Sequence, residues 1–276
     1  MFIYNTYIKF NLIELINMKV DKLTSKAIQA KQRAVAEQRF MGRPSKGDNS
    51  GRLPPGQSLV KGLPVLDLGV HPEIEHAHWR LTIDGLVKTP VVIDWAQFNT
   101  LEQHSTTVDI HCVTAWSSFD NEWSGVSTVQ LAELVNPLPG ASHVLLHAAD
   151  GYTTNVPVED FFSADCLVAT GWNGDPLSAS HGGPARTVIP HLYFWKSAKW
   201  ITRIEFIDAD QPGYWERRGY HNDGDPWQEQ RYGAPLPREP QPQVSASPTP
   251  AIQADPTPSL IKRVSGWIRY HFFPDS

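Results

Sequence analysis

Two cysteines, Cys112 and Cys166, occur in the 276-residue chain, and their surroundings differ. Cys112 ends a strand-like run in the stretch DIHCVTAWS and begins a polar turn beside His111. A thiol in such a turn can present a thiolate to a soft or high-valent metal, although a buried core position is the alternative for any single cysteine. Cys166 lies in the apolar run ADCLVATGW, so we expect it to be a core residue.

Basic side chains surround a glycine turn in the stretch LSASHGGPARTVIPHLYFWKSAK. His181 and Arg186 flank the turn Gly182-Gly183-Pro184, and Lys199 follows. Glycine lets the backbone approach a ligand closely, and guanidinium and ammonium groups suit a phosphate or another anion. The stretch therefore predicts an anion site or, as the alternative, a strand with ordinary surface charges.

Tyr152 follows the turn Asp150-Gly151, after the apolar run of residues 144–146. A tyrosine in such a turn is either a packed corner or a phenol donor to a site.

The elements that must position these residues are short, and strands dominate. Apolar runs such as residues 79–83 and 144–146 alternate with Gly, Asp and Pro turns. The clearest helix is residues 128–135, with Ser127 or Thr128 as its N-cap and Pro137 after its end. Residues 158–162 are a second candidate helix. We expect an α+β domain with few helices and a mostly antiparallel or mixed sheet.

Composition divides the chain into four parts. Residues 1–52 form an N-terminal extension, with Met18 as an alternative start, and residues 21–39 within it read as a solvated helix or a flexible arm. Residues 53–232 form the folded domain, and the Pro-, Ala- and Ser-rich residues 233–259 form a linker. Residues 260–276 form an amphipathic segment, whose apolar side on a helix is Leu260, Val264, Trp267, Ile268 and His271.

Charge and cysteine usage exclude several classes of protein. A formal net charge of -5 argues against a general nucleic-acid binder. Two cysteines without a CxxC motif argue against a disulfide framework, a zinc knuckle and an attached c-type haem. No run approaches the roughly 18 apolar residues of a membrane span, and the first residues do not read as a secretion signal, so we expect a cytoplasmic protein.

Four separated stretches resemble the sulfite-oxidase-fold family of molybdopterin-dependent oxidoreductases. HCVTAW resembles the metal-binding cysteine segment, especially the RCVEAW type in catalytic subunits of bacterial protein-methionine-sulfoxide reductases. SHGGPARTVIP with KSAKW resembles the pterin-binding segment, GYTTNVP the active-site tyrosine turn, and GYWERRGYHNDGDPW the end of the catalytic domain. The resemblance covers residues 53–227 and implies a sulfite-oxidase-type, mostly β domain like that of the short, stand-alone sulfite oxidase-like oxidoreductases.

The resemblance implies a Mo-molybdopterin cofactor, whose dithiolene brings two sulfurs of its own. Cys112 would then be the protein's only direct bond to molybdenum, and Tyr152 would be a donor or proton relay beside the metal. The implied reaction is a two-electron oxygen-atom transfer on a small sulfur- or nitrogen-oxygen compound. The residues that the resemblance places around the pterin and its phosphate are His181, Arg186, Ser197 and Lys199.

Two positions and one short stretch depart from the family pattern. Trp116 stands where sulfite oxidases have an arginine that helps to hold sulfite, which favours a less charged substrate such as a sulfoxide. Tyr152 and His181, in contrast, are closer to the sulfite-oxidase pattern. In the early cofactor-contacting stretch only Asp67 offers a polar match, and Ala148 removes a hydroxyl contact before the tyrosine turn.

Neither the family's dimerisation domain nor a haem domain is recognised, so we expect a monomer that exchanges electrons with a separate haem or flavin protein. We expect residues 260–273 to dock that partner or a membrane surface. Two alternatives remain: a non-catalytic binding protein that kept the fold, and a cysteine-nucleophile hydrolase, for which no nucleophile elbow or oxyanion loop is recognised.

Overall fold

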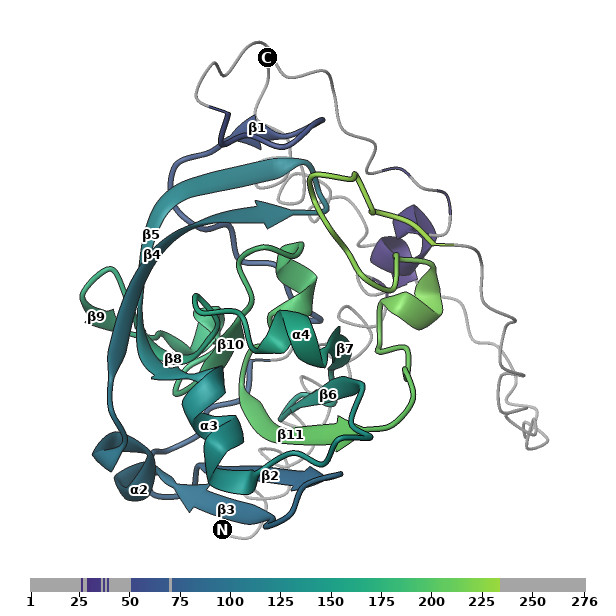
Figure 1. Ribbon diagram of the computed structural model, residues 1–276. Helices are drawn as coiled ribbons and strands as arrows, with labels where there is room; N and C mark the ends of the chain where they lie inside the picture. The colour runs from purple at the N-terminus through teal and green to yellow at the C-terminus, as the bar shows by residue number, and fades with distance from the viewer. Residues whose placement is uncertain are drawn as a thin grey trace, which may run out of the picture. The chain divides into compact units, whose positions relative to one another are not determined.

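The computed structural model describes residues 26, 29–35, 37, 39, 51–69 and 71–233 (Figure 1). Most of the N-terminal extension and of the linker, and all of the segment 260–276, lie outside these residues, so the predicted boundaries at 52, 232 and 259 stay predictions. None of the helices in the described part of the chain is long and apolar enough to cross a membrane.

The first sheet is built around the long hairpin of β4 (His104–Cys112) and β5 (Trp116–Ser127). β5 pairs with β4 along its length, with β1 (Ser58–Leu59) at its beginning and with β8 (Leu167–Trp172) at its end. The sheet is completed by β9 (Asp175–Pro176) and β10 (Arg186–Val188). Figure 1 shows the hairpin arching past β8 and β10, so that one sheet carries both Cys112 and Arg186.

The second sheet has the order β3-β2-β11-β6-β7. Its strands are β3 (Val91–Asp94), β2 (Arg80–Gly85), β11 (Ile201–Ile207), β6 (His143–Ala148) and β7 (Thr153–Pro157). β11 runs parallel to β2 and antiparallel to β6, and the turn between β6 and β7 carries Tyr152. The predicted α+β domain with a mixed, mostly antiparallel sheet and few helices is confirmed.

The predicted helix at residues 128–135 is α3 (Thr128–Val135), and its N-cap is Ser127, whose hydroxyl accepts a hydrogen bond from the Gln130 amide at 3.2 Å. The candidate at residues 158–162 is α4 (Val158–Phe161). The sequence reading missed α2 (Trp95–Thr100), although Asp94 and Gln97 form a reciprocal capping box at its start. Three 3₁₀ helices follow: η1 (Ala179–His181), η2 (Phe194–Lys196) and η3 (Glu216–Arg218).

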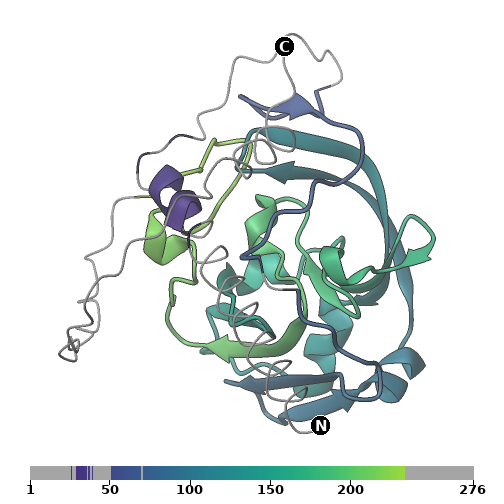
Figure 2. The ribbon, with the colours of Figure 1, turned by 180° about the vertical axis from the view of Figure 1, so that it is seen from behind.

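Buried side chains form two clusters. One packs around the second sheet and contains Trp79, Phe98 and Tyr152. The other contains Cys112, Trp116 and Trp123. Seen from behind in Figure 2, the hairpin and the second sheet border the same interior, which lets residues from both sheets and from η2 approach one another.

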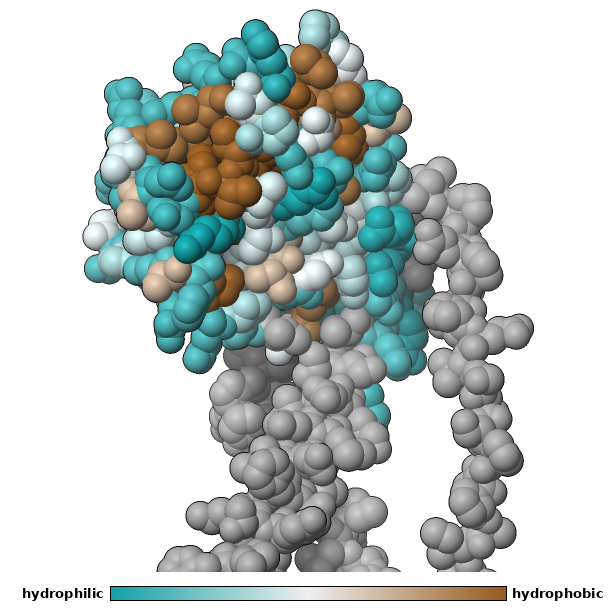
Figure 3. Space-filling view, turned by 90° about the horizontal axis from the view of Figure 1, so that it is seen from below, coloured by the Kyte–Doolittle hydropathy of each residue, from teal (hydrophilic) through white to brown (hydrophobic). Residues whose placement is uncertain are grey.

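Figure 3 shows apolar residues gathered on the face seen from below. Large apolar side chains on or beside α3 and β3, at this end of the ribbon, are more than a third exposed, namely Val92, Val129, Leu134 and Leu138. Apolar atoms make up much of any folded surface, so this face requires no partner to explain it.

Candidate functional site

Cys112 is the last residue of β4, and the three residues after it turn the chain into β5. Its side chain is buried, and its sulfur lies 3.1 Å from the Thr114 hydroxyl. Gln57 donates a hydrogen bond to the Cys112 carbonyl at 3.1 Å, and Arg231 donates to the Val113 carbonyl at 2.7 Å. The backbone around the thiol is therefore held from two other parts of the chain.

Burial raises the pKa of the Cys112 thiol, while the Thr114 hydroxyl and the positive charge of Arg231 act in the opposite direction. The neighbouring His111 pairs through its Nδ1 with the Ser117 hydroxyl at 2.8 Å, and no hydrogen bond within the described residues joins its ring to the Cys112 sulfur. Burial also lowers the pKa of His111 to about 4, so its imidazole is neutral near pH 7. This geometry does not favour a hydrolase, and a bound metal would supply the positive charge that a buried thiolate needs.

An aromatic cluster connects the cysteine turn to the basic stretch. Trp116 pairs with Cys112 across the hairpin, and its ring lies 6.5 Å from the ring of Phe194 in η2. The guanidinium carbon of Arg186 lies 4.2 Å from the Phe194 ring centroid and 5.4 Å from that of Trp123. Cys112 and Arg186, which are 74 residues apart in the sequence, thus border one interior region.

Arg186 is a buried cation that backbone carbonyls hold. It donates to the carbonyls of His181 at 3.0 Å, Ser197 at 3.1 Å and Thr187 at 3.3 Å. No carboxylate of the described residues forms an ion pair with it, and burial lowers its pKa to about 9. A guanidinium in this setting is only partly compensated and can accept an anionic ligand.

Lys199 and His181 lie close to Arg186. Lys199 donates to the Ser180 carbonyl at 2.7 Å and to the Asp67 carboxylate at 3.3 Å. Burial and the charge of Arg186 lower the pKa of Lys199 to about 8, against the opposing effect of Asp67. Burial, Arg186 and Lys199 also lower the pKa of His181. The hydrogen bonds of Arg186 to the His181 carbonyl and of Lys199 to the Ser180 carbonyl bring the three predicted basic residues together at the glycine turn.

The hydroxyl groups of Ser197 and Tyr152 each form a hydrogen bond with the backbone. The Ser197 hydroxyl accepts a hydrogen bond from the Ile189 amide at 2.9 Å. The Tyr152 hydroxyl donates to the Trp195 carbonyl at 2.6 Å, and burial followed by the charge of Glu216 raises the Tyr152 pKa well above its ordinary value. Tyr152 thus fixes η2, and no hydrogen bond within the described chain joins its phenol to Cys112.

Lys196, next to this stretch, is committed elsewhere. Its ammonium is fully buried and lies 2.8 Å from a carboxylate oxygen of Glu216, and it also donates to Asn155. The sequence offered no sign of this pairing, because the two charges come from segments 20 residues apart.

Two buried indole groups point to a missing acceptor. The ring nitrogens of Trp116 and Trp123 have no hydrogen-bond partner in the described structure. Buried donors are rarely left unpaired, so both are available to an acceptor-rich ligand beside Arg186. Among the described residues, no group of three or more His, Cys, Asp and Glu side chains could hold a metal ion. Molybdopterin, with its dithiolene, polar pterin and phosphate, fits this set of groups.

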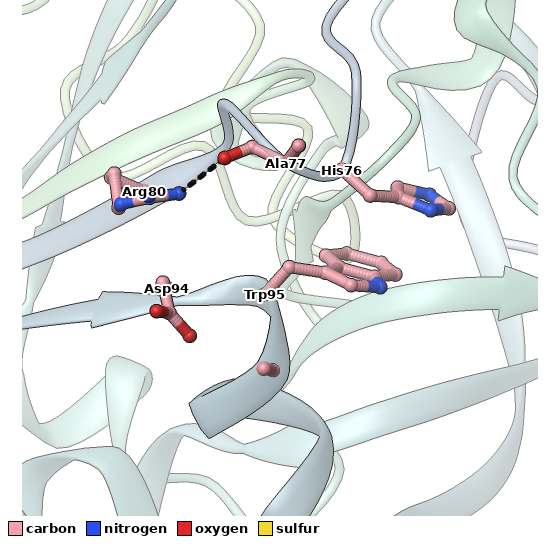
Figure 4. Close-up of a pocket in the computed structure, with 6 residues that line it drawn as sticks. His76, Ala77, Arg80, Asp94 and Trp95 are labelled. Atoms are coloured by element: carbon pink, nitrogen blue, oxygen red, sulfur yellow. Dashed lines mark hydrogen bonds between the residues drawn. The ribbon is translucent and has the colours of Figure 1, made fainter.

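A separate surface pocket of about 190 Å³ lies at the start of α2 (Figure 4). The rings of His76 and Trp95 stack there with centroids 4.0 Å apart. None of the predicted site residues lines it; the lining is His76, Ala77, Arg80, Asp94, Trp95 and Ala96.

Comparisons with known proteins agree on the kind of domain. The family described as "Oxidoreductase molybdopterin binding domain" matches residues 68–215, more than half of the chain. The "Uncharacterized oxidoreductase YuiH" of Bacillus subtilis (strain 168) is 44% identical over 194 residues, which are 70% of this chain and 98% of YuiH.

More distant relatives are covered only in part. The protein-methionine-sulfoxide reductase catalytic subunit MsrP of Gluconobacter oxydans is 29% identical over 157 residues, and the match spans 50% of each protein. Among solved structures, the sulfane dehydrogenase SoxCD of Paracoccus pantotrophus has a TM-score of 0.47 at 23% identity, over 50% of this chain and 40% of that one.

Proposed function

Since the chain belongs to the molybdopterin-binding oxidoreductase family, we propose that it transfers an oxygen atom to or from a small sulfur- or nitrogen-oxygen compound. The observation that carries the proposal is the arrangement around the aromatic cluster of Trp116, Trp123 and Phe194. Cys112, whose thiol is buried, pairs with Trp116 in the hairpin, and the buried guanidinium of Arg186, which has no carboxylate partner in the described chain, lies over the Phe194 ring.

In this proposal Cys112 is the residue that would hold molybdenum, through its thiolate. Thr114 and Arg231 favour the ionised sulfur, and the hydrogen bonds to the carbonyls of Cys112 and Val113 fix its position. When bound, Mo-molybdopterin supplies the two-electron chemistry, and the protein supplies orientation and electrostatics.

The basic stretch would hold the organic part of the cofactor. Arg186 and Lys199 provide positive charge for its phosphate, and His181 lies beside them as a neutral ring near pH 7. Ser197 contributes through its backbone, because its carbonyl already orients Arg186. Tyr152 keeps its proton near neutral pH and positions η2, so we propose it as a positioning residue rather than as a direct donor.

For the substrate, the observation is Trp116 at the first position of β5, beside Cys112 in the hairpin register. An indole cannot pair with sulfite as a guanidinium would, so we propose a less charged substrate such as a sulfoxide. A sulfoxide substrate is consistent with the name of the relative MsrP, a protein-methionine-sulfoxide reductase catalytic subunit. Electrons would be exchanged with a separate redox protein.

The test is to purify the full chain from a molybdate-supplied host and to measure molybdenum, pterin and turnover. We expect about one molybdenum and one pterin per chain, oxidation of reduced viologen by sulfoxides or N-oxides, and slower reaction of sulfite with an artificial acceptor. Cofactor without turnover with any of these compounds would favour the non-catalytic alternative. Protein free of molybdenum and pterin would contradict the proposal.

A further inference from the structure

We propose that the helical residues 29–35 belong to the cofactor site and that Lys31 contributes a cation to its phosphate end, next to Lys199. This inference rests on the proposed function, and it concerns a residue outside the matched family segment of residues 68–215. It also changes the view of residues 21–39, which the sequence led us to expect as a solvated helix or a flexible arm.

The helix is docked on the domain by both apolar and polar contacts. Val35 is only 1% exposed and belongs to the same buried cluster as Cys112. Gln32 donates a hydrogen bond to the Tyr214 hydroxyl at 3.1 Å. Figures 1 and 2 both show this purple helical segment against the green chain around η3, so the docking surface is the segment that follows β11.

Docking brings Lys31 to the residue that Lys199 also contacts. The Lys31 ammonium donates to the Asp67 carbonyl, and the Asp67 carboxylate accepts from Lys199 at 3.3 Å. The same carboxylate also pairs with His71 at 2.7 Å and accepts from the Gly69 amide at 2.7 Å. Because one carboxylate already serves several donors, it compensates neither lysine fully.

Cations exceed anions in this region. Three cations, Lys31, Lys199 and Arg186, interact in this region with two carboxylates, Asp67 and Asp150. Burial lowers the pKa of Lys31, as expected for an ammonium that lacks a full counter-ion. A phosphate ester, which carries a charge of about −1.5 to −2 near pH 7, would balance the excess.

Lys31 has the chemistry that this role requires. An ammonium has three donors, and the Asp67 carbonyl uses one of them, so the others can reach a phosphate oxygen. Arg33 lies on the same helix and is exposed, which provides a matched variant that removes an equal charge from a position outside the site.

The experiment compares Lys31→Met, Lys31→Arg and Arg33→Met in the full, cofactor-loaded chain. The readout is the molybdenum and pterin that remain on the protein during dialysis in high salt. We expect Lys31→Met to lose both about tenfold faster than the wild type, a size typical for one charge-assisted hydrogen bond. Lys31→Arg and Arg33→Met should retain both at the wild-type rate.

Equal retention in Lys31→Met and the wild type would overturn the inference, and so would equal loss in Arg33→Met. The thermal midpoint of each cofactor-free variant separates binding from folding: we expect Lys31→Met to stay within a few degrees of the wild type, and a large drop would assign Lys31 a structural role instead. Wild-type protein purified without molybdenum and pterin would instead contradict the proposed function. Failure of the present inference looks different, because the wild type and Lys31→Met would then both carry cofactor and lose it at the same rate.

Discussion

At the residue scale, burial disfavours the charged forms of the basic side chains in the site. Arg186 and Lys199 are surrounded by backbone carbonyls and aromatic rings, and Asp67 is the one carboxylate bonded to either of them in the described structure. Burial therefore lowers the pKa of both groups. The cofactor-free protein should therefore bind an anion at this site, since a nearby negative charge stabilises the protonated forms of Arg186 and Lys199.

The pH dependence of anion binding follows from the pKa of Lys199. The pKa of Lys199 is about 8 in the folded protein and 10.5 ordinarily. Between pH 8 and pH 10.5 the unfolded chain therefore binds more protons than the folded protein. The contribution of Lys199 to the free energy of unfolding consequently rises with pH over this range. Above pH 8 Lys199 is increasingly neutral and must take up a proton when an anion binds, so the affinity of the site for the anion falls.

We predict that sulfate, whose charge is constant near neutral pH, raises the thermal midpoint of the cofactor-free protein at pH 7 and does so less at higher pH. The control is Lys199→Met, in which the sulfate effect should be small at every pH. A sulfate effect that is independent of pH in the wild type would contradict the role of Lys199.

The sequence predicted the local setting of single residues, but it did not predict which distant residues they contact. Cys112 at the end of a strand and Cys166 in the core could be read from local composition, and the structure buries Cys166 completely. The pairing of Lys196 with Glu216 and the link between Trp116 and Arg186 through Phe194 could not, because they depend on which segments meet in three dimensions.

At the element scale, the turn between β9 and β10 shapes the basic site. Gly182 has φ +103, and a Cβ there would lie 2.9 Å from the Cβ of Lys199 and 3.0 Å from its Cα. The turn therefore needs glycine for its left-handed backbone and for the close approach of Lys199.

We predict that Gly182→Ala destabilises the protein and weakens cofactor retention. The matched control is Gly174→Ala, because Gly174 has φ +84 but a Cβ added there would meet no atom within 4 Å, so it reports backbone strain alone, about 1 kcal/mol. Chemical unfolding and pterin content measure the two effects. Equal results for both variants would show that the contact with Lys199 is unimportant.

The predictable elements of the fold were those marked by features of their own sequence, such as a capping residue or an apolar run. α3 has a capping serine and a following proline, and β6 contains the apolar run of residues 144–146, so both were anticipated. α2 was missed because six residues give little helical periodicity, although its capping box was a usable signal. The parallel pairing of β11 with β2 has no local signal, because more than 100 residues separate the two strands.

At the scale of the whole molecule, a buried polar network ties the second sheet to the site. One oxygen of Glu216 accepts from Thr154 of β7 at 2.9 Å, from Trp195 of η2 at 2.8 Å and from Lys196 at 2.8 Å. Trp195 and Lys196 directly precede Ser197, whose carbonyl accepts a hydrogen bond from Arg186, and they lie a few residues before Lys199. The network therefore connects the second sheet to the segment that holds the basic site.

We predict that Glu216→Gln lowers the unfolding free energy by about 3 kcal/mol, because it leaves the buried ammonium of Lys196 without its counter-ion. The thermal midpoint should fall on the order of 10 °C. Glu205→Gln, which removes a partly exposed partner of Arg203, is the control and should cost about 1 kcal/mol or less. Similar losses in the two variants would contradict the importance of the buried network.

X-ray absorption at the molybdenum edge counts the sulfur ligands of the metal and so reports whether the Cys112 sulfur is one of them. We predict that Cys112→Ser, which should lose turnover while keeping the pterin, shows one sulfur ligand fewer than the wild type, whereas Cys166→Ala shows the wild-type number. An unchanged sulfur count in Cys112→Ser would contradict the account.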